Sequence, residues 1–137
     1  MKWMLDTNTC IALIRQAPEV TIRKLRGKSM GQVGVSSIVL SELSYGAARS
    51  ARPAQNQAAL QEFLMALEVA PYDYAAALQY GMVRAALEQK GRPVGPRDTL
   101  IAAHAMSLDV ILVTHNRREF ERVKGLRVED WSRGRAQ

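Results

Sequence analysis

Short apolar runs alternate with longer helical patterns along the chain, and this alternation limits the choice of fold more than any other feature. The apolar runs are typical of strands, and they lie at residues 2–5, 32–35, 68–70, 110–113 and 127–129. The stretches between them have helical spacing and helix-start residues, and they predict helices at residues 10–14, 18–26, 38–46, 53–67, 74–90 and 98–108. Strands that alternate with helices favour an α/β fold, with a central, mainly parallel sheet of four to five strands and helices on both faces.

Length and composition predict one domain. The chain has 137 residues, and we place the domain over residues 1–131, with a frayed tail over residues 132–137. Every apolar run is shorter than the ~18 residues of a membrane span, and the first residues do not resemble a signal peptide. The single cysteine, Cys10, excludes an internal disulfide and suits a reducing compartment. Together these features predict a cytoplasmic protein.

Three carboxylates, Asp6, Glu42 and Asp98, each stand in a stretch that is otherwise nearly free of charge. Glu42, for example, is the only charged residue between Lys28 and Arg49. A carboxylate in apolar surroundings is costly unless it is paired, hydrogen-bonded or bound to a metal. If the fold brings the three together, their repulsion calls for a divalent cation, and oxygen ligands suit Mg²⁺ or Mn²⁺.

The predicted sheet offers a place where these acids can meet. Ligands of an open parallel sheet bind beyond the carboxyl ends of its strands, and Asp6 lies at such an end. Asp98 lies in the first turn of the helix that leads into the strand at 110–113, and we expect it at the same edge only if that helix is tilted or offset. Glu42 reaches the edge if its helix packs beside the first helix. Taken singly, each acid also fits a structural role, as a helix cap, a favourable charge at a helix start or an exposed helix edge.

The chain is basic, with a formal net charge of +6 from 19 Lys and Arg against 13 Asp and Glu. A charge of this sign favours a polyanionic partner, such as nucleic acid or an acidic protein. Ordinary solvation of a surface explains the composition equally well. A basic surface around an acidic metal site would attract phosphates while the acids hold the ion.

Around the three acids, the chain closely resembles the PIN-domain ribonucleases, and among them the VapC toxins of type II toxin–antitoxin pairs. The matching segments are Met-Leu-Asp-Thr-Asn at 4–8, residues 37–47 around Glu42, residues 96–105 around Asp98, residues 113–120 and Val-Glu-Asp-Trp at 128–131. They span nearly the whole chain in the right order. The resemblance implies a PIN-like fold and a metal-dependent endoribonuclease that needs Mg²⁺, for which Mn²⁺ can substitute.

The resemblance also assigns roles to individual residues. Asp6, Glu42 and Asp98 stand at the metal-site positions, with Asp6 and Asp98 as the main direct ligands and Glu42 completing the shell or orienting the attacking water. Many relatives carry a fourth acid, often an aspartate in the turn after the strand at 110–113, but this chain has Asn116 there. Either Asn116 serves as a neutral ligand to metal-bound water or Glu119 supplies the fourth carboxylate, and we favour Glu119 with Asn116 supporting it.

Neighbouring polar residues are candidates for supporting roles. Hydroxyl or amide groups beside the acids can bond to a carboxylate or a metal-bound water, and in this group we place Thr7, Asn8 and Thr99 with Asn116. The candidates for contacts to the RNA phosphates are Arg97, Arg117 and Arg118. Helix capping and plain solvation are the respective alternatives. We expect His104, on an apolar helix face, to be a core residue.

The resemblance implies partners as well. We expect a cognate VapB antitoxin, a homodimer of this chain, and a larger assembly with antitoxin that binds operator DNA. The preferred substrate is initiator tRNA, cut in the anticodon loop to inhibit translation. Three alternatives stay open: a receiver-like Mg²⁺-binding signalling domain, a non-catalytic RNA-binding module, and a metal-dependent nuclease that acts on DNA.

Overall fold

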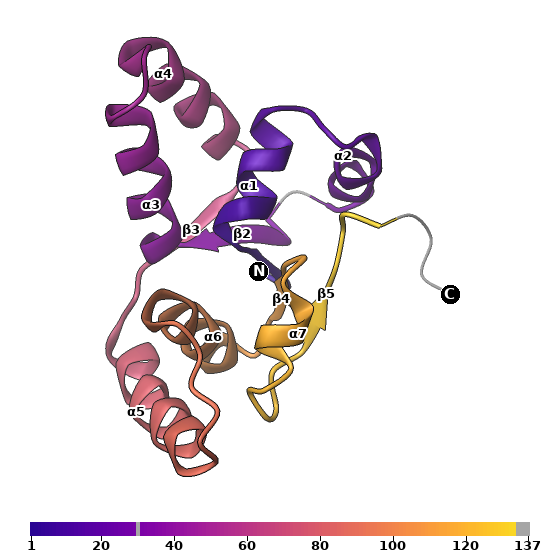
Figure 1. The fold of residues 1–137 in the computed structure, drawn as a ribbon. Coiled ribbons are helices and arrows are strands. Elements are labelled where there is room, and N and C mark those ends of the chain that lie inside the picture. The colour runs from indigo at the N-terminus through magenta and orange to yellow at the C-terminus, as the bar shows by residue number, and fades with distance from the viewer. Residues whose placement is uncertain (30, 134–137) are drawn as a thin grey trace.

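Five strands form one sheet in the computed structural model, which describes residues 1–29 and 31–133 (Figure 1). The strands are β1 (Trp3–Leu5), β2 (Val33–Ser36), β3 (Glu68–Ala70), β4 (Ile111–Val113) and β5 (Val128–Glu129). The helices are α1 (Thr7–Ile14), α2 (Glu19–Arg26), α3 (Ser37–Ala48), α4 (Pro53–Leu64), α5 (Tyr74–Gln89), α6 (Pro96–Leu108) and α7 (Arg117–Phe120). The predicted α/β fold is therefore confirmed.

The strand order is β3-β2-β1-β4-β5, and every neighbouring pair is parallel. Leu5 of β1 lies opposite Val35 on one side and Val113 on the other. The chain builds outward from β1 in one direction and then crosses to β4 on the other side, so a switch point lies between β1 and β4, where open α/β sheets bind ligands. A receiver domain has the order 2-1-3-4-5, and the receiver-like alternative therefore does not fit this chain.

The central strands are apolar because both faces of the sheet are covered. Figure 1 shows α5 and α6 on one side of the sheet and α1 and α2 on the other. Met4, Leu5, Leu112 and Val113 are all completely buried. The core is thus continuous through the sheet, and it fixes the strand ends that carry the polar residues.

The position of α6 corrects one expectation. Only Asp109, with a left-handed φ of 55°, and Val110 separate α6 from β4. A helix joined so closely to a strand runs back along it in the opposite direction, and its first turn therefore lies at the carboxyl edge of the sheet. No tilt or offset is needed for Asp98 to reach that edge.

Other boundaries differ from the sequence prediction by a few residues. The helix α6 begins at Pro96, two residues before the predicted start, and α4 ends at Leu64. The short helix α7 was not predicted. No helix within residues 1–29 and 31–133 is both long and apolar enough to cross a membrane. The frayed tail stays a prediction, because residues 134–137 of it lie outside the described part of the chain.

Candidate active site

Asp6 is fixed at the switch point by its neighbours in the sequence and in the sheet. It ends β1 and is the N-cap of α1, and its Oδ1 accepts the Thr9 N–H at 2.8 Å. Its own N–H donates to the Val113 carbonyl on β4 at 3.0 Å. The side chain is only 7% exposed. The cap uses one carboxylate oxygen in this role, and it holds the carboxylate at the carboxyl edge of β1.

Asp98 and Glu119 form the centre of the acidic cluster. Asp98 lies in the first turn of α6, and the Glu119 carboxyl on α7 lies close enough to raise its pKa. Burial raises the pKa of Asp98 to about 6, and Glu119 and then Asp6 add to the rise, whereas the Arg97 charge opposes it. The structure therefore brings Asp6, Asp98 and Glu119 near one another, and their mutual repulsion is felt at Asp98.

Glu42 joins this cluster through an arginine. Its helix α3 packs beside α1, as the convergence of the acids requires. The Glu42 carboxylate forms an ion pair with the Arg97 guanidinium, 55 positions away in the sequence and adjacent to Asp98. Glu42 is thus linked to the cluster through Arg97, and its charge is not among the causes of the raised pKa of Asp98.

An open hollow of about 270 Å³ lies beside the acids. Its walls are Thr7, Gly95, Pro96, Arg97, Asp98 and Ile101. The hollow lies between the starts of α1 and α6, where unpaired backbone N–H groups favour negative charge. It has room for ordered water or a phosphate group.

The donor set fits a hard cation. Asp6, Asp98 and Glu119 supply carboxylate groups near one another, and the raised pKa of Asp98 reflects negative charge that a dication would relieve. No three Asp, Glu, His or Cys side chains of the described residues stand close enough to hold one ion as they lie. Because Arg97 is paired with Glu42, the acidic side chains would have to rotate to bring their oxygens around one ion.

The predicted supporting residues have different surroundings in the structure. Thr7 lines the hollow beside Asp98, and Asn8 is exposed one position further along α1. The Thr99 hydroxyl donates to the Val94 and Gly95 carbonyls at 3.2 and 2.9 Å, which is the capping alternative to its predicted role. Thr99 therefore secures the connector before α6 instead of bonding to Asp98.

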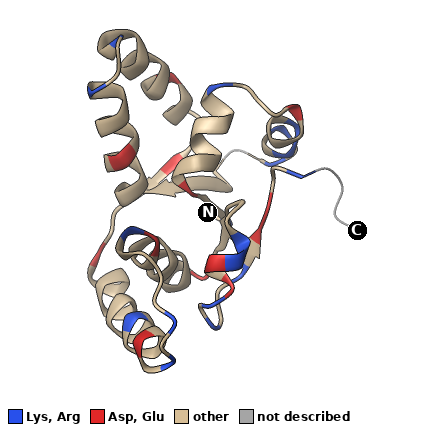
Figure 2. Cartoon of the chain, in the orientation of Figure 1, with Lys and Arg blue, Asp and Glu red and all other residues tan. Residues whose placement is uncertain are grey.

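The turn after β4 holds the remaining candidates. Asn116 is exposed, and its backbone N–H donates to the Thr114 hydroxyl at 3.0 Å. Arg117 and Arg118 are both exposed at the start of α7, where they can meet a long anion. Figure 2 shows their positive charge beside the negative charge of the same helix.

His104 is a core residue, as predicted. It is 1% exposed on α6, and its Nδ1 lies 2.8 Å from the Ser36 hydroxyl. Sequence reasoning found the acids but missed two long-range pairs, Ser36 with His104 and Glu42 with Arg97. Their partners lie 68 and 55 positions apart, and no local pattern marks them.

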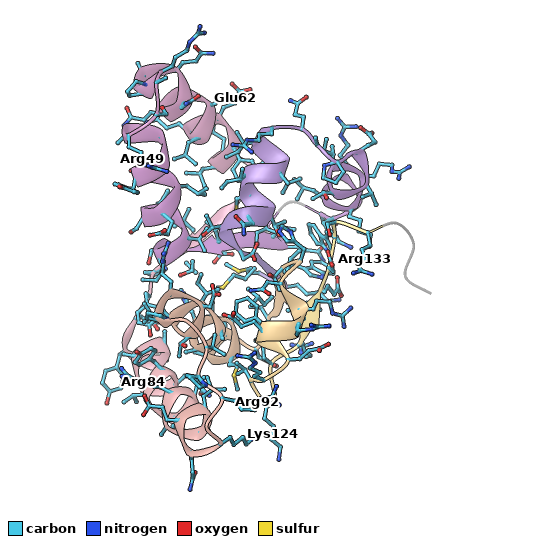
Figure 3. The ribbon with its side chains drawn as sticks, in the orientation of Figure 1. Arg49, Glu62, Arg84, Arg92, Lys124 and Arg133 are labelled. Carbon is cyan, nitrogen blue, oxygen red and sulfur yellow. The ribbon has the colours of Figure 1, made fainter. Side chains whose placement is uncertain are left out.

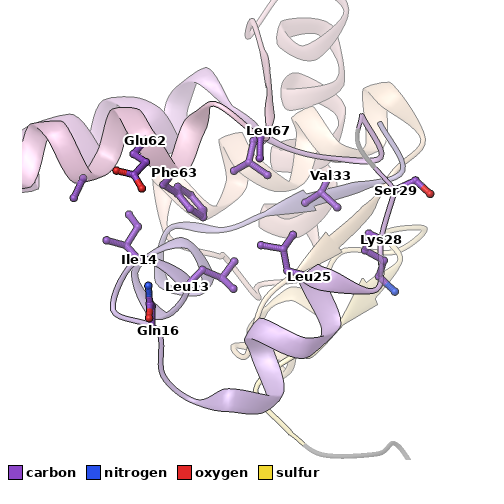
Figure 4. Close-up of a pocket in the computed structure, with 12 residues that line it drawn as sticks. Leu13, Ile14, Gln16, Leu25, Lys28, Ser29, Val33, Glu62, Phe63 and Leu67 are labelled. Atoms are coloured by element: carbon purple, nitrogen blue, oxygen red, sulfur yellow. The ribbon is translucent and has the colours of Figure 1, made fainter.

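A second, apolar groove lies away from the acids, between α1, α2 and α4. It has a volume of about 510 Å³. Figure 4 shows the side chains of Leu13, Leu25, Phe63 and Leu67 around it, with Lys28 and Glu62 also on its walls. An open apolar groove of this kind is typical of a surface that binds a partner.

The chain is similar to known proteins over nearly its whole length. The family model of the PIN domain matches residues 3–126. A "tRNA(fMet)-specific endonuclease VapC" of Shigella flexneri is 48% identical over 132 residues, which cover 96% of this chain and 99% of that one. "Ribonuclease VapC2" of Haemophilus influenzae is 41% identical over 96% of this chain and 98% of its own length.

Solved structures agree with the sequence relatives. The DNA-bound VapBC complex of Salmonella typhimurium contains a chain with a TM-score of 0.90 and 49% identity, covering 96% of this chain and 98% of that chain. A VapBC2 complex of Rickettsia felis, bound to a promoter DNA fragment, gives a TM-score of 0.87 at 38% identity, over 96% of this chain and 99% of that one. The chain therefore belongs to the PIN-domain family, in its VapC group.

Proposed function

We propose that this chain is an Mg²⁺-dependent endoribonuclease, the toxin of a toxin–antitoxin pair, and that initiator tRNA is its substrate. The observation that carries the proposal is the meeting of Asp6, Asp98 and Glu119 at the switch point, which raises the pKa of Asp98 to about 6. A group of partly buried carboxylates beside an open hollow suits a metal-assisted attack on a phosphodiester. The relatives named as tRNA(fMet)-specific endonucleases, 48% and 49% identical, support the choice of substrate.

In the proposed mechanism each acid has a different role. Asp6 and Asp98 would hold Mg²⁺, and Glu119 would supply the fourth carboxylate. The bound ion would activate a water molecule and stabilise the charge that develops on the phosphate. Glu42 orients the attacking water or completes the ligand shell. In-line attack leaves a 5′-phosphate and a 3′-hydroxyl.

The arginines around the site would bind the RNA. Arg97 lines the hollow, and Arg117 and Arg118 are exposed at the start of α7. Arginine is suited to phosphate because its planar guanidinium donates two parallel hydrogen bonds. Such contacts position the backbone of the RNA and do not read its sequence. Cleavage of the initiator tRNA would then inhibit translation.

The expected protein partners have surfaces to bind. The apolar groove between α1, α2 and α4 (Figure 4) is our candidate surface for a VapB antitoxin, since the similar solved structures include VapBC complexes. Tyr74, Leu78 and Met82 recur every four residues along α5 and are 79%, 57% and 69% exposed, so we assign this face to the homodimer. In complex with antitoxin, the assembly would bind operator DNA.

One experiment tests the activity and the substrate together. Total tRNA is incubated with the purified chain and Mg²⁺, and new 5′ ends are mapped by sequencing. We expect cuts in the anticodon loop of initiator tRNA, no cuts with EDTA, and restored cuts with added Mg²⁺ or Mn²⁺. Asp98→Asn should bind RNA but not cut it.

The outcomes separate this proposal from its alternatives. Cleavage by Asp98→Asn at the wild-type rate would remove the acidic cluster from the mechanism. RNA binding that is unaffected by EDTA, without any cleavage, would indicate a non-catalytic RNA-binding module. A parallel panel of single-stranded and flap DNA would detect a nuclease that prefers DNA.

A further inference from the structure

The ion pair between Glu42 and Arg97 joins the two helices that border the site. Glu42 is on α3 and Arg97 is the residue directly before Asp98 on α6. The same two residues have separate candidate roles, as a carboxylate for Mg²⁺ and as a contact for phosphate. While they bind each other, neither carries out its own role.

The surroundings of Glu42 explain why it needs a cation. It is 28% exposed, at the edge of a hollow of about 380 Å³ between α1, α3 and α4. Ile11, Leu43 and Leu60 are among the apolar side chains of that hollow. A carboxylate against apolar side chains is unfavourable unless a positive charge balances it, and in the ion pair Arg97 supplies that charge.

The surroundings of Arg97 explain why the pair can break. Its side chain is 65% exposed and also lines the hollow beside Asp98. Exposed ion pairs are weak, since water screens them and both side chains lose freedom. A phosphodiester of RNA that enters this hollow offers the guanidinium two non-bridging oxygens, which share one negative charge and can accept two hydrogen bonds, in exchange for one carboxylate.

We infer that Arg97 is a tethered cation that occupies Glu42 until RNA binds, and that it then exchanges Glu42 for a phosphate of the RNA. Released, Glu42 turns to the Mg²⁺ ion. Arg97 is a positioning residue in this scheme, because it acts on the metal site through Glu42. The inference rests on the proposed function, and it adds that RNA binding and Mg²⁺ binding assist each other.

Mg²⁺ binding without RNA gives the direct test. Mg²⁺ is titrated calorimetrically into the full-length chain at pH 7.5. Because Arg97 competes with Mg²⁺ for Glu42, we expect Arg97→Gln to bind Mg²⁺ about fivefold more tightly than the wild type. In a Glu42→Gln background the same Arg97→Gln change should give a clearly smaller gain, since only the direct effect of the Arg97 charge on Asp98 then remains. Arg97→Gln should also raise the KM for RNA.

A matched control separates competition from general charge. Arg49 also lines the hollow next to Glu42, but its guanidinium lies 5.6 Å from the Tyr45 ring centre at the far end of α3 (Figure 3). Arg49→Gln removes the same charge without touching the pair, and its Mg²⁺ affinity should stay within about twofold of the wild type. Equal gains in Arg49→Gln and Arg97→Gln, or a gain from Arg97→Gln that is undiminished with Glu42→Gln, would overturn the exchange.

The two proposals fail in different ways. If the wild type binds Mg²⁺ and needs it for cleavage, but Arg97→Gln leaves the Mg²⁺ affinity unchanged, the exchange alone is wrong. If no variant binds Mg²⁺ and cleavage survives EDTA, the metal-dependent mechanism is wrong, and the exchange with it.

Discussion

The imidazole Nδ1 of His104 lies 2.8 Å from the hydroxyl of Ser36, and both residues are buried. Ser36 is the N-cap of α3, where its oxygen accepts the Ile38 N–H at 3.0 Å. The tautomer of the His104 ring decides whether the hydroxyl or the ring nitrogen donates in this bond. Six positions beyond Ser36 along α3 is Glu42, and six positions before His104 along α6 is Asp98. One buried hydrogen bond thus ties together the two helices that carry these acids.

We expect His104→Leu to destabilise the fold by about 1–3 kcal/mol at pH 7.5, because a buried hydrogen bond is lost. The loss of stability caused by His104→Leu should be smaller at acidic pH. Burial lowers the pKa of His104, although Asp73 and the Pro71 carbonyl act in the other direction. The unfolded chain therefore takes up this proton first, and wild-type stability falls as the pH drops below about 6.5. Urea unfolding of both proteins at pH 7.5 and 5.5 measures the difference, and a cost that does not depend on pH would contradict it.

A second prediction concerns the charge of Asp98 without metal. Its pKa in the folded chain is about 6, well above the ordinary value of 3.8. The folded state therefore holds this proton more tightly than the unfolded state, and ionisation reduces stability as the pH rises from about 4 to 6. In EDTA, Asp98→Asn should raise Tm by about 2–5 °C at pH 7.5 and leave it nearly unchanged at pH 4. A lower Tm at pH 7.5 would mean that Asp98 is a structural acid.

The same pKa sets the pH range of the activity. A proton on Asp98 competes with Mg²⁺, so metal affinity should fall as the pH drops through about 6. Initial cleavage rates at limiting Mg²⁺, measured from pH 5 to 8, should rise steeply through that value. At saturating Mg²⁺ the rise should move to lower pH. A pH profile that is the same at limiting and at saturating Mg²⁺ would show that the titrating group is not a metal ligand.

A fourth prediction concerns the end of the described chain. The indole N–H groups of Trp3 and Trp131 both donate to Oε1 of Glu129, at 3.2 and 3.1 Å, and the Thr21 hydroxyl donates to the Trp131 carbonyl at 2.9 Å. Glu129 thereby connects β1 to the segment after β5. Glu129→Ala should cost about 1–3 kcal/mol, because two indole N–H groups lose their acceptor. Cleavage per folded molecule should be unchanged, and Glu129→Gln, which keeps an acceptor oxygen, should recover part of the stability.

The sequence identified the fold well because of how the sheet is buried. The strands β1, β2 and β4 have helices on both faces, so they appear as unbroken apolar runs, and the structure places them within one residue of prediction. The short helix α7 was missed, because four residues make barely one turn and show no periodicity. The pairing of Glu42 with Arg97 could not be predicted, because the two residues lie far apart in the sequence. The hydroxyl of Thr99 donates to backbone carbonyls before α6.

The last prediction decides which residue fills the fourth acidic position. The Glu119 carboxyl raises the pKa of Asp98, whereas Asn116 is exposed in the turn before α7. Glu119→Gln should therefore lower the pKa of Asp98 in a carbon-13 carboxyl titration and reduce kcat by about 10-fold or more, as loss of a metal-site acid does. Asn116→Ala should leave that pKa in place and have a smaller effect on kcat. The reverse result, with cleavage lost in Asn116→Ala and kept in Glu119→Gln, would assign the fourth position to Asn116 and leave Glu119 as a neighbour that only disturbs the ionisation of Asp98.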